Sequence, residues 1–141
     1  MRFKEEWRPL KGYEDRFLIS NKGRIKRIER FNGKYTIKER IMKQKITKFG
    51  YNAISLWDGK LLKFHLVHRL VALNFIPNPN NKPVIDHIDG NKLNNSIENL
   101  EWVSTAENNQ RAYDKGLQRR IHAGQWIKGS NRIRIQKEDL L

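Results

Sequence analysis

The sequence contains no cysteine in its 141 residues. This absence excludes disulfide bonds and thiolate zinc sites, and it fits an intracellular protein. The sequence also contains no run of about 18 apolar residues, the length that a helix needs to cross a bilayer. Its first residues, MRFKEEWRPL, lack the apolar segment of a secretory signal. We therefore expect neither a membrane span nor a secretory leader.

Negative charge is also scarce. There are 29 Lys and Arg against 15 Asp and Glu, which gives a net charge of +14 at pH 7. A field of this sign concentrates polyanions at the surface, and the lack of a membrane-spanning segment favours nucleic acid over anionic lipid. The 38% of apolar residues suffice for a modest core in one domain or two small ones.

The positive charge is concentrated in residues 22–48, KGRIKRIERFNGKYTIKERIMKQKITK, which hold eleven Lys or Arg and two Glu. Apolar and aromatic side chains alternate with the basic ones there. This pattern favours a strand surface that follows a phosphate backbone over a face that is merely solvated. We predict phosphate contacts from this stretch and from basic residues nearer the C-terminus, namely Lys22, Arg24, Lys26, Arg27, Lys43, Lys45, Lys48, Arg111, Lys115, Arg119 and Arg120.

Periodicity predicts two hairpins and one helix before residue 78. Residues 17–27 are typical of a strand, a turn and a returning strand. Residues 51–66 predict a second hairpin, with Asp58-Gly59 as a type I′ turn. Residues 66–76 change to helical spacing, and Pro77 ends the helix. We expect three leucines on one side of this helix, Leu66, Leu70 and Leu73.

Residues 84–113, VIDHIDGNKLNNSIENLEWVSTAENNQRAY, combine an Asp-His pair with six asparagines. VIDHI and NLEWVS are predicted strands, with a long polar loop between them. Ser104 and Glu107 have the spacing of a capping box. We therefore predict a helix from Thr105 to about Lys115, ended by Gly116. The predicted order is strand, loop, strand, helix.

This order suggests a site for a divalent metal ion. If the helix packs across the two strands, Asn108 can face Asp86, and carboxylate and amide oxygens suit Mg²⁺, Mn²⁺ or Ca²⁺. His87, as a neutral imidazole, can take a proton from water near pH 7. Neighbouring residues of a strand point to opposite faces, so one shared site requires the strand to end or twist at Asp86 and His87.

Purely structural roles for the histidines also remain possible interpretations. Asp86 and His87 can be an ordinary pair in an Asn-rich loop. His65 and His68 have a spacing that zinc sites use, but no third ligand is obvious near them, and an apolar surrounding favours a role in the core or beside the site.

The residues Asp86, His87, Asn99 and Asn108 resemble the HNH motif of ββα-metal nucleases, with asparagine in place of the final histidine. Residues 68–109 are similar to the phage and intron-encoded HNH homing endonucleases. Residues 5–27, EEWRPLKGYEDRFLISNKGRIKR, resemble a small DNA-binding module often found before such nucleases.

This resemblance implies an α+β fold, with a ββα-metal HNH core in residues 51–116. A basic β-rich module in residues 1–50 precedes the core, and a basic tail in residues 117–141 follows it. We do not expect the tail to form a full DNA-reading domain. By the same resemblance, His87 is the general base, Asp86 and Asn108 hold one Mg²⁺ or Mn²⁺, and Asn99 fixes the loop and orients the histidine.

The implied activity is hydrolysis of phosphodiester bonds in double-stranded DNA by a phage homing or nicking endonuclease. The enzyme is expected to be a monomer with no membrane partner, in the cytoplasm of a bacterial host. A rival hypothesis is a DNA-binding regulatory module whose HNH fold no longer cuts, and the intact set of site residues argues against it. An RNA-binding accessory protein is a third, and no RNP-type strand supports it.

Overall fold

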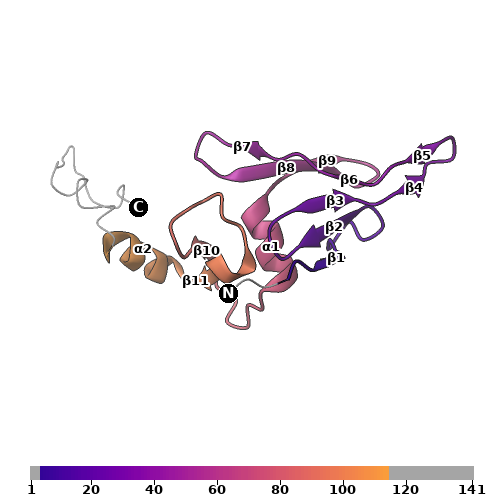
Figure 1. Ribbon diagram of the computed structural model, residues 1–141. Coiled ribbons are helices and arrows are strands. Elements are labelled where there is room, and N and C mark those ends of the chain that lie inside the picture. The colour runs from indigo at the N-terminus through magenta and orange to yellow at the C-terminus, as the bar shows by residue number, and fades with distance from the viewer. Residues whose placement is uncertain (1–3, 115–141) are drawn as a thin grey trace. The chain divides into compact units, whose positions relative to one another are not determined.

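The N-terminal part forms an antiparallel sheet in the order β1-β2-β3-β6 (Figure 1). The computed structural model describes residues 4–114. The strands of this sheet are β1 (Trp7–Pro9), β2 (Phe17–Ser20), β3 (Ile25–Arg27) and β6 (Arg40–Ile41). Ile19 pairs with Ile25 across the predicted turn, which confirms the first hairpin. Two short strands, β4 (Arg30–Phe31) and β5 (Thr36–Ile37), form a separate hairpin between β3 and β6.

A second sheet contains β7 (Lys45–Ile46), β8 (Asn52–Trp57) and β9 (Leu62–Leu66) in that order. The hairpin of β8 and β9 confirms the second predicted hairpin, but its turn differs from the predicted type I′ turn. Residues 58–61 form a four-residue loop, in which Gly59 has a positive φ of +106°. The Asp58 Oδ1 accepts hydrogen bonds from the backbone amides of Lys60 and Leu61 at 2.8 and 2.9 Å. This local side-chain bonding explains why a longer loop replaces the two-residue turn.

The helix α1 (Val67–Phe75) packs against both sheets, since it contacts β2, β8 and β9. It ends before Pro77 as predicted, but one of its leucines lies on the unexpected side. Leu70 is buried, whereas Leu73 is half exposed, and His68 and Asn74 are buried in its place. Asn74 fits there because its Nδ2 donates to the Leu70 carbonyl and its Oδ1 accepts from the Lys11 amide.

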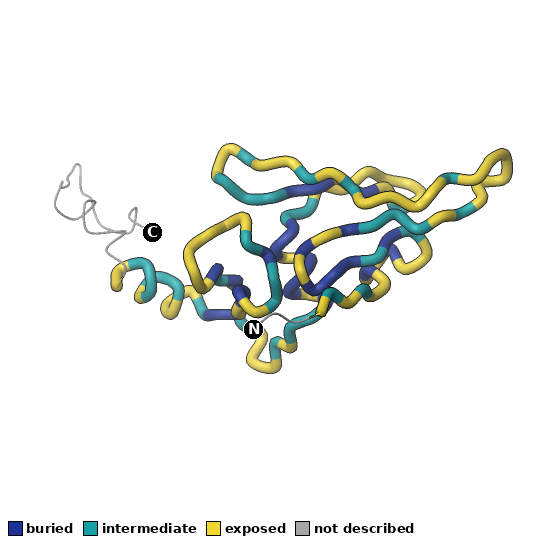
Figure 2. The backbone as a smooth tube through the Cα atoms, viewed as in Figure 1, coloured by how far each residue is buried: buried dark blue, intermediate teal, exposed yellow. Residues whose placement is uncertain are grey.

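The core around α1 contains residues from Leu10 to Trp102. Figure 2 shows the buried segments along β2, β8 and α1. One continuous cluster joins Leu10, Tyr13, Phe17, Ile19, Ile25, Ile54, Leu56, Val67, Leu70, Val71, Ala72, Ile85, Leu100 and Trp102. The β-rich N-terminal residues therefore share their core with the strands that follow.

The last described elements are β10 (Val84–His87), a 3-10 helix η1 (Ile97–Asn99), β11 (Leu100–Val103) and α2 (Thr105–Asp114). The strands β10 and β11 form a sheet of two strands, and this order confirms the predicted strand, loop, strand and helix. The capping box is also confirmed: Glu107 Oε1 accepts from the Ser104 amide, and Ser104 Oγ accepts from the Glu107 amide. Lys115 and the predicted terminator Gly116 lie outside the described residues.

Two compact units make up the chain. The first takes in residues up to Asn81 together with Ile85–Trp102, and the second takes in Lys82–Val84 and the residues from Val103 onward. Within residues 4–114, no helix has both the length and the apolar character that crossing a membrane requires. The predicted boundaries near residues 50 and 116 stay predictions.

Candidate active site

The strand β10 ends at His87, which brings Asp86 and His87 to the start of a loop. The amide of Gly90 donates to the His87 carbonyl at 2.8 Å, and the amide of Ile88 donates to the Asn99 carbonyl at 2.8 Å. Gly90 has a positive φ of +77°, which a glycine adopts without strain. The strand therefore ends where a shared site requires it to end. Asp86 is half-buried, and the side chain of His87 is only 6% exposed.

Asn99 closes the loop between β10 and β11. It is 6% exposed, and its Oδ1 accepts from the amide of Asp89 at 2.9 Å. Its Nδ2 donates to Asp89 Oδ1 and to the Asn94 carbonyl, each at 2.9 Å. Asp89 also accepts from the Asn94 side chain and the Asn91 amide, and these bonds lower the pKa of its carboxyl group. Asn99 thus acts on the loop rather than directly on the His87 ring.

The hydrogen bond to the His87 ring comes from another asparagine. His87 Nε2 lies 2.8 Å from Asn95 Oδ1, and Asn95 is 5% exposed. The ring centroid lies 5.0 Å from that of His68 and 6.2 Å from that of Tyr51. The sequence pattern indicates neither Asn95 nor Tyr51 as a contact of His87, because the loop holds several equivalent asparagines and Tyr51 lies far from His87 in the chain.

The other two described histidines have packing partners of their own. His68 stacks on Tyr51 with 5.1 Å between ring centroids, and His65 Nε2 lies 2.7 Å from the Tyr13 hydroxyl oxygen. Burial, followed by the nearby His87 and Arg69, lowers the pKa of His68 to about 4. His68 is therefore neutral at physiological pH. These contacts favour the packing role over the zinc alternative, and no group of three His, Cys, Asp or Glu within residues 4–114 is arranged to hold a metal ion.

Asn108 lies on α2, in the second compact unit, whereas Asp86 lies in the first. Asn108 is half-buried, and its backbone amide donates to the Ser104 carbonyl at 2.9 Å in the first turn of the helix. Arg111, one turn later, is also half-buried. The pairing of Asp86 with Asn108 stays a prediction.

Three of the predicted DNA-contacting residues, in β3 and just before it, already have partners within the protein. Arg24 donates to both carboxylate oxygens of Glu5, at 2.6 and 3.0 Å. Lys26 lies 4.4 Å from the centre of the Trp7 ring, and Arg27 Nε donates to the Lys38 carbonyl. Arg24 in particular is less available to a phosphate than its sequence position suggests, because its guanidinium fork is already occupied.

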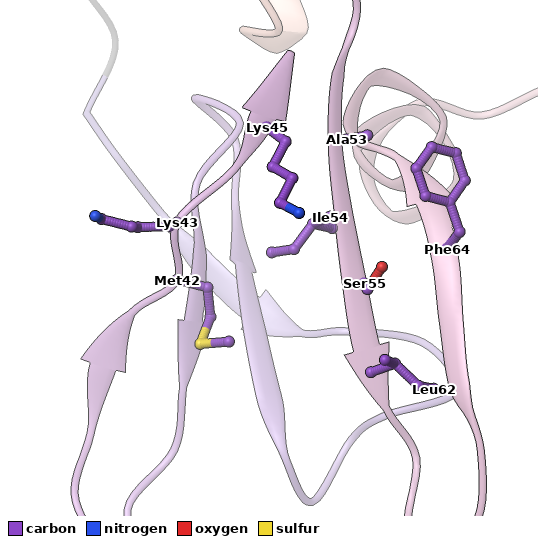
Figure 3. A pocket seen from close by; sticks show the side chains of 8 residues that line it. All are labelled: Met42, Lys43, Lys45, Ala53, Ile54, Ser55, Leu62 and Phe64. Atoms are coloured by element: carbon purple, nitrogen blue, oxygen red, sulfur yellow. The ribbon is translucent and has the colours of Figure 1, made fainter. Parts of the chain in front are cut away.

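The lysines around β7 are exposed instead. Lys43 and Lys45 line a pocket of about 300 Å³ on the second sheet, and Lys48 is exposed nearby in the sequence. In Figure 3, Lys45 extends toward Ile54, whereas Lys43 points away from the other lining side chains. Met42, Ala53, Ser55, Leu62 and Phe64 complete the lining. Lys22 is exposed, and Lys115, Arg119 and Arg120 lie outside the described residues.

Known proteins share both parts of this chain. Residues 5–57 match the family described as the NUMOD4 motif, and residues 65–110 match the family described as HNH endonuclease. The DNA endonuclease I-HmuI of Bacillus phage SP01 is 38% identical over 112 residues, which are 79% of this chain and 59% of that protein. An uncharacterized HNH endonuclease of Acanthamoeba polyphaga mimivirus is 38% identical over 118 residues, which are 80% of this chain and 27% of that protein.

A solved structure of the HNH homing endonuclease I-HmuI, concerned with its DNA binding and cleavage, gives a TM-score of 0.65 at 37% identity. The match covers 79% of this chain and 59% of that chain. The predicted α+β fold with a β-rich N-terminal module is thereby confirmed. This chain spans about three fifths of the length of I-HmuI.

The lowered pKa of His68 predicts a loss of stability in acid. Since the folded state binds this proton only near pH 4, whereas the unfolded state binds it near pH 6.5, stability falls as the pH falls through that window. At 1.36 kcal/mol per pH unit, the loss amounts to about 3 kcal/mol. Urea unfolding of the wild type and of His68→Gln at several pH values tests this. The stability advantage of the wild type should shrink as the pH falls from 7 to 4, and a constant difference would contradict the assignment.

Proposed function

The chain carries a domain of the HNH endonuclease family behind a NUMOD4 motif, and on that premise we propose that it is a metal-dependent DNA endonuclease that hydrolyses phosphodiester bonds. The observation that carries the proposal is the family match over residues 65–110, which takes in Asp86, His87, Asn99 and Asn108. The strand end at His87 and the loop that Asn99 closes support it, because they present an acid and a base from one short segment.

His87 is the proposed general base. Its imidazole takes a proton from the water that attacks phosphorus, and it is held ready for this by the end of β10. Asn99 is a positioning residue: its three side-chain hydrogen bonds keep the loop closed while the histidine gains and loses a proton. The two residues thus divide the work between proton transfer and support of the loop.

Asp86 and Asn108 are the proposed ligands of one Mg²⁺ or Mn²⁺. The donor set fits such an ion, because a carboxylate and an amide oxygen are hard ligands and both side chains are half-buried rather than sealed from solvent. When bound, a divalent ion supplies positive charge that stabilises the phosphate and the departing oxygen. Two protein ligands leave the remaining positions to water and phosphate, so we expect weak binding of Mg²⁺ without DNA.

We further propose that one chain cuts one strand and that the enzyme is a phage-type homing or nicking endonuclease. The sequence contains a single Asp-His pair, and one ion serves one phosphate at a time. The relative from Bacillus phage SP01 supports a phage origin, and hence the cytoplasm of a bacterial host. On supercoiled plasmid with one target site, nicked circles should therefore accumulate before linear product.

The role of His87 predicts a separation of cleavage from binding. His87→Ala should lower the rate of plasmid nicking by roughly 100-fold or more in the presence of Mg²⁺, because general-base catalysis typically contributes that much. Its affinity for target DNA, measured in EDTA, should stay nearly unchanged. His65→Gln is the matched control, since His65 contacts Tyr13 instead of the site. A parallel loss of binding and cleavage in His87→Ala would make His87 structural, and a wild type that binds DNA without cutting it would favour the silent regulatory module.

The exposure of the lysines around β7 predicts the salt dependence of DNA binding. Replacing Lys43 and Lys45 with Gln should flatten the slope of log Kd against log salt by roughly 0.9 for each phosphate that the protein no longer neutralises. Arg24→Gln should change the slope less, because Glu5 already neutralises the Arg24 guanidinium. Fluorescence anisotropy with a duplex at four or more salt concentrations measures both slopes. A larger change for Arg24→Gln than for the lysine pair would move the DNA surface to the four-stranded sheet.

A further inference from the structure

We propose that Asn95 is a positioning residue that fixes the tautomer of His87, and that a turn of the N-terminal sheet holds Asn95 in place. The turn consists of residues 20–23, between β2 and β3. This inference rests on the proposed function, because the tautomer matters to cleavage only if His87 is the base. It assigns a role to a residue outside the four of the HNH motif.

The contact between Asn95 and His87 leaves one tautomer. Asn95 Oδ1 carries no hydrogen and can only accept, so the hydrogen in the 2.8 Å bond belongs to His87 Nε2. The other ring nitrogen, Nδ1, then carries the lone pair that takes a proton. Both side chains are about 95% buried, so water hardly competes for this bond, and its loss would leave a buried polar group without a partner.

Ring packing fixes the plane of the imidazole but not its tautomer. The His68 and Tyr51 rings lie beside the His87 ring, and Lys92 lies 4.7 Å from the centre of the Tyr51 ring. Lys92 Nζ also donates to the Phe49 carbonyl at 3.0 Å, which ties the loop to the start of β8. These contacts restrict rotation of the ring, but they do not decide which nitrogen carries the hydrogen. That choice falls to Asn95.

Asn95 is placed by close contact with Gly23. A Cβ atom added to Gly23 would lie 3.0 Å from Asn95 Cβ and 3.1 Å from the Asn95 carbonyl oxygen, so only glycine leaves room for Asn95 here. The amide of Ile97 donates to the Asn21 carbonyl at 3.0 Å, which joins the same turn to the segment after Asn95. Gln44 Nε2 donates to the Gly23 carbonyl at 2.9 Å.

The turn itself is held firmly. Asn21 is buried, its Oδ1 accepts from the Glu6 amide, and its Nδ2 donates to the Lys4 carbonyl. Ser20 Oγ accepts from the amides of Lys22 and Arg24 across the turn. A rigid turn can hold Asn95 at a fixed position. The N-terminal module therefore contributes to the catalytic geometry as well as to the fold.

The experiment measures the tautomer and the kinetics in the same full-length proteins. Nitrogen-15 NMR of the histidine side chains, in the neutral form of the ring, should show His87 protonated at Nε2 in the wild type. Asn95→Leu keeps a similar volume but removes the acceptor, so part or all of the hydrogen should move to Nδ1. Its kcat for DNA nicking should fall roughly 10–100-fold, the range seen when the hydrogen-bond partner of a metal-binding histidine is removed, with KM nearly unchanged. Asn95→Asp keeps the accepting oxygen, so it should keep the Nε2–H signature and recover most of kcat.

A second pair of variants tests the turn. Gly23→Ala should shift the tautomer and lower kcat in the same direction as Asn95→Leu. Gly12→Ala is the matched control, because Gly12 also has a positive φ, of +87°, but a Cβ there would meet nothing within 4 Å. Equal effects of the two glycine variants would show that the close contact between Gly23 and Asn95 does not set the tautomer of His87.

Two results would overturn the proposal. One is a wild-type His87 protonated at Nδ1, which stands as a contradiction whether or not the variants fold. The other is an Asn95→Leu protein with an unchanged tautomer and an unchanged kcat. A wild type that shows the Nε2–H signature but cuts no DNA with Mg²⁺ or Mn²⁺ would contradict the proposed function and leave the tautomer assignment standing.

Discussion

The candidate site depends most on the hydrogen bonds that the buried side-chain amide of Asn99 makes. This amide makes three hydrogen bonds, one accepted and two donated, to Asp89 and Asn94 of the loop between β10 and β11. If these bonds are broken, a buried amide keeps no partner, and the loop that carries Asn95 loses its closure. Asn95 in turn contacts the His87 ring. The position of the proposed base thus follows from a network of asparagine amides around the Asp89 carboxylate.

The N-terminal module and the elements from β8 to β11 depend on one another. Their apolar side chains share one core around α1, and Gly23 of the β2–β3 turn lies against Asn95 of the loop between β10 and β11. A protein in which the two parts formed separate cores would allow the site to keep its shape without the module. In this chain, a substitution in the module is expected to alter the geometry of the site through a few direct contacts.

Local patterns in the sequence predicted much of the fold. The capping box of Ser104 and Glu107, the two strands around the polar loop and the end of β10 at His87 all follow from neighbouring residues. The errors are those in which side-chain chemistry or packing decided between local alternatives, as in the Asp58 loop and at exposed Leu73.

The partner of His87 was beyond such reasoning. The loop offers several asparagines with equal hydrogen-bonding capacity, and only Asn95 has the close tertiary contact with Gly23. Tyr51, just before β8, and His68, on α1, meet the His87 ring only through tertiary folding. The four motif residues, in contrast, came from the resemblance to the HNH motif; the family match over residues 65–110 spans their positions, and their roles stay predictions.

We propose a one-metal nuclease site built from Asp86, His87 and Asn108. Its most direct test is a crystal structure of the full chain with duplex DNA and Mn²⁺, in which anomalous scattering locates the ion. We predict one anomalous peak per chain, with the oxygens of Asp86, Asn108 and one DNA phosphate as ligands and with His87 Nδ1 facing the attacking water. An ion bound away from Asp86 and Asn108, or a phosphate out of reach of His87, would contradict the account.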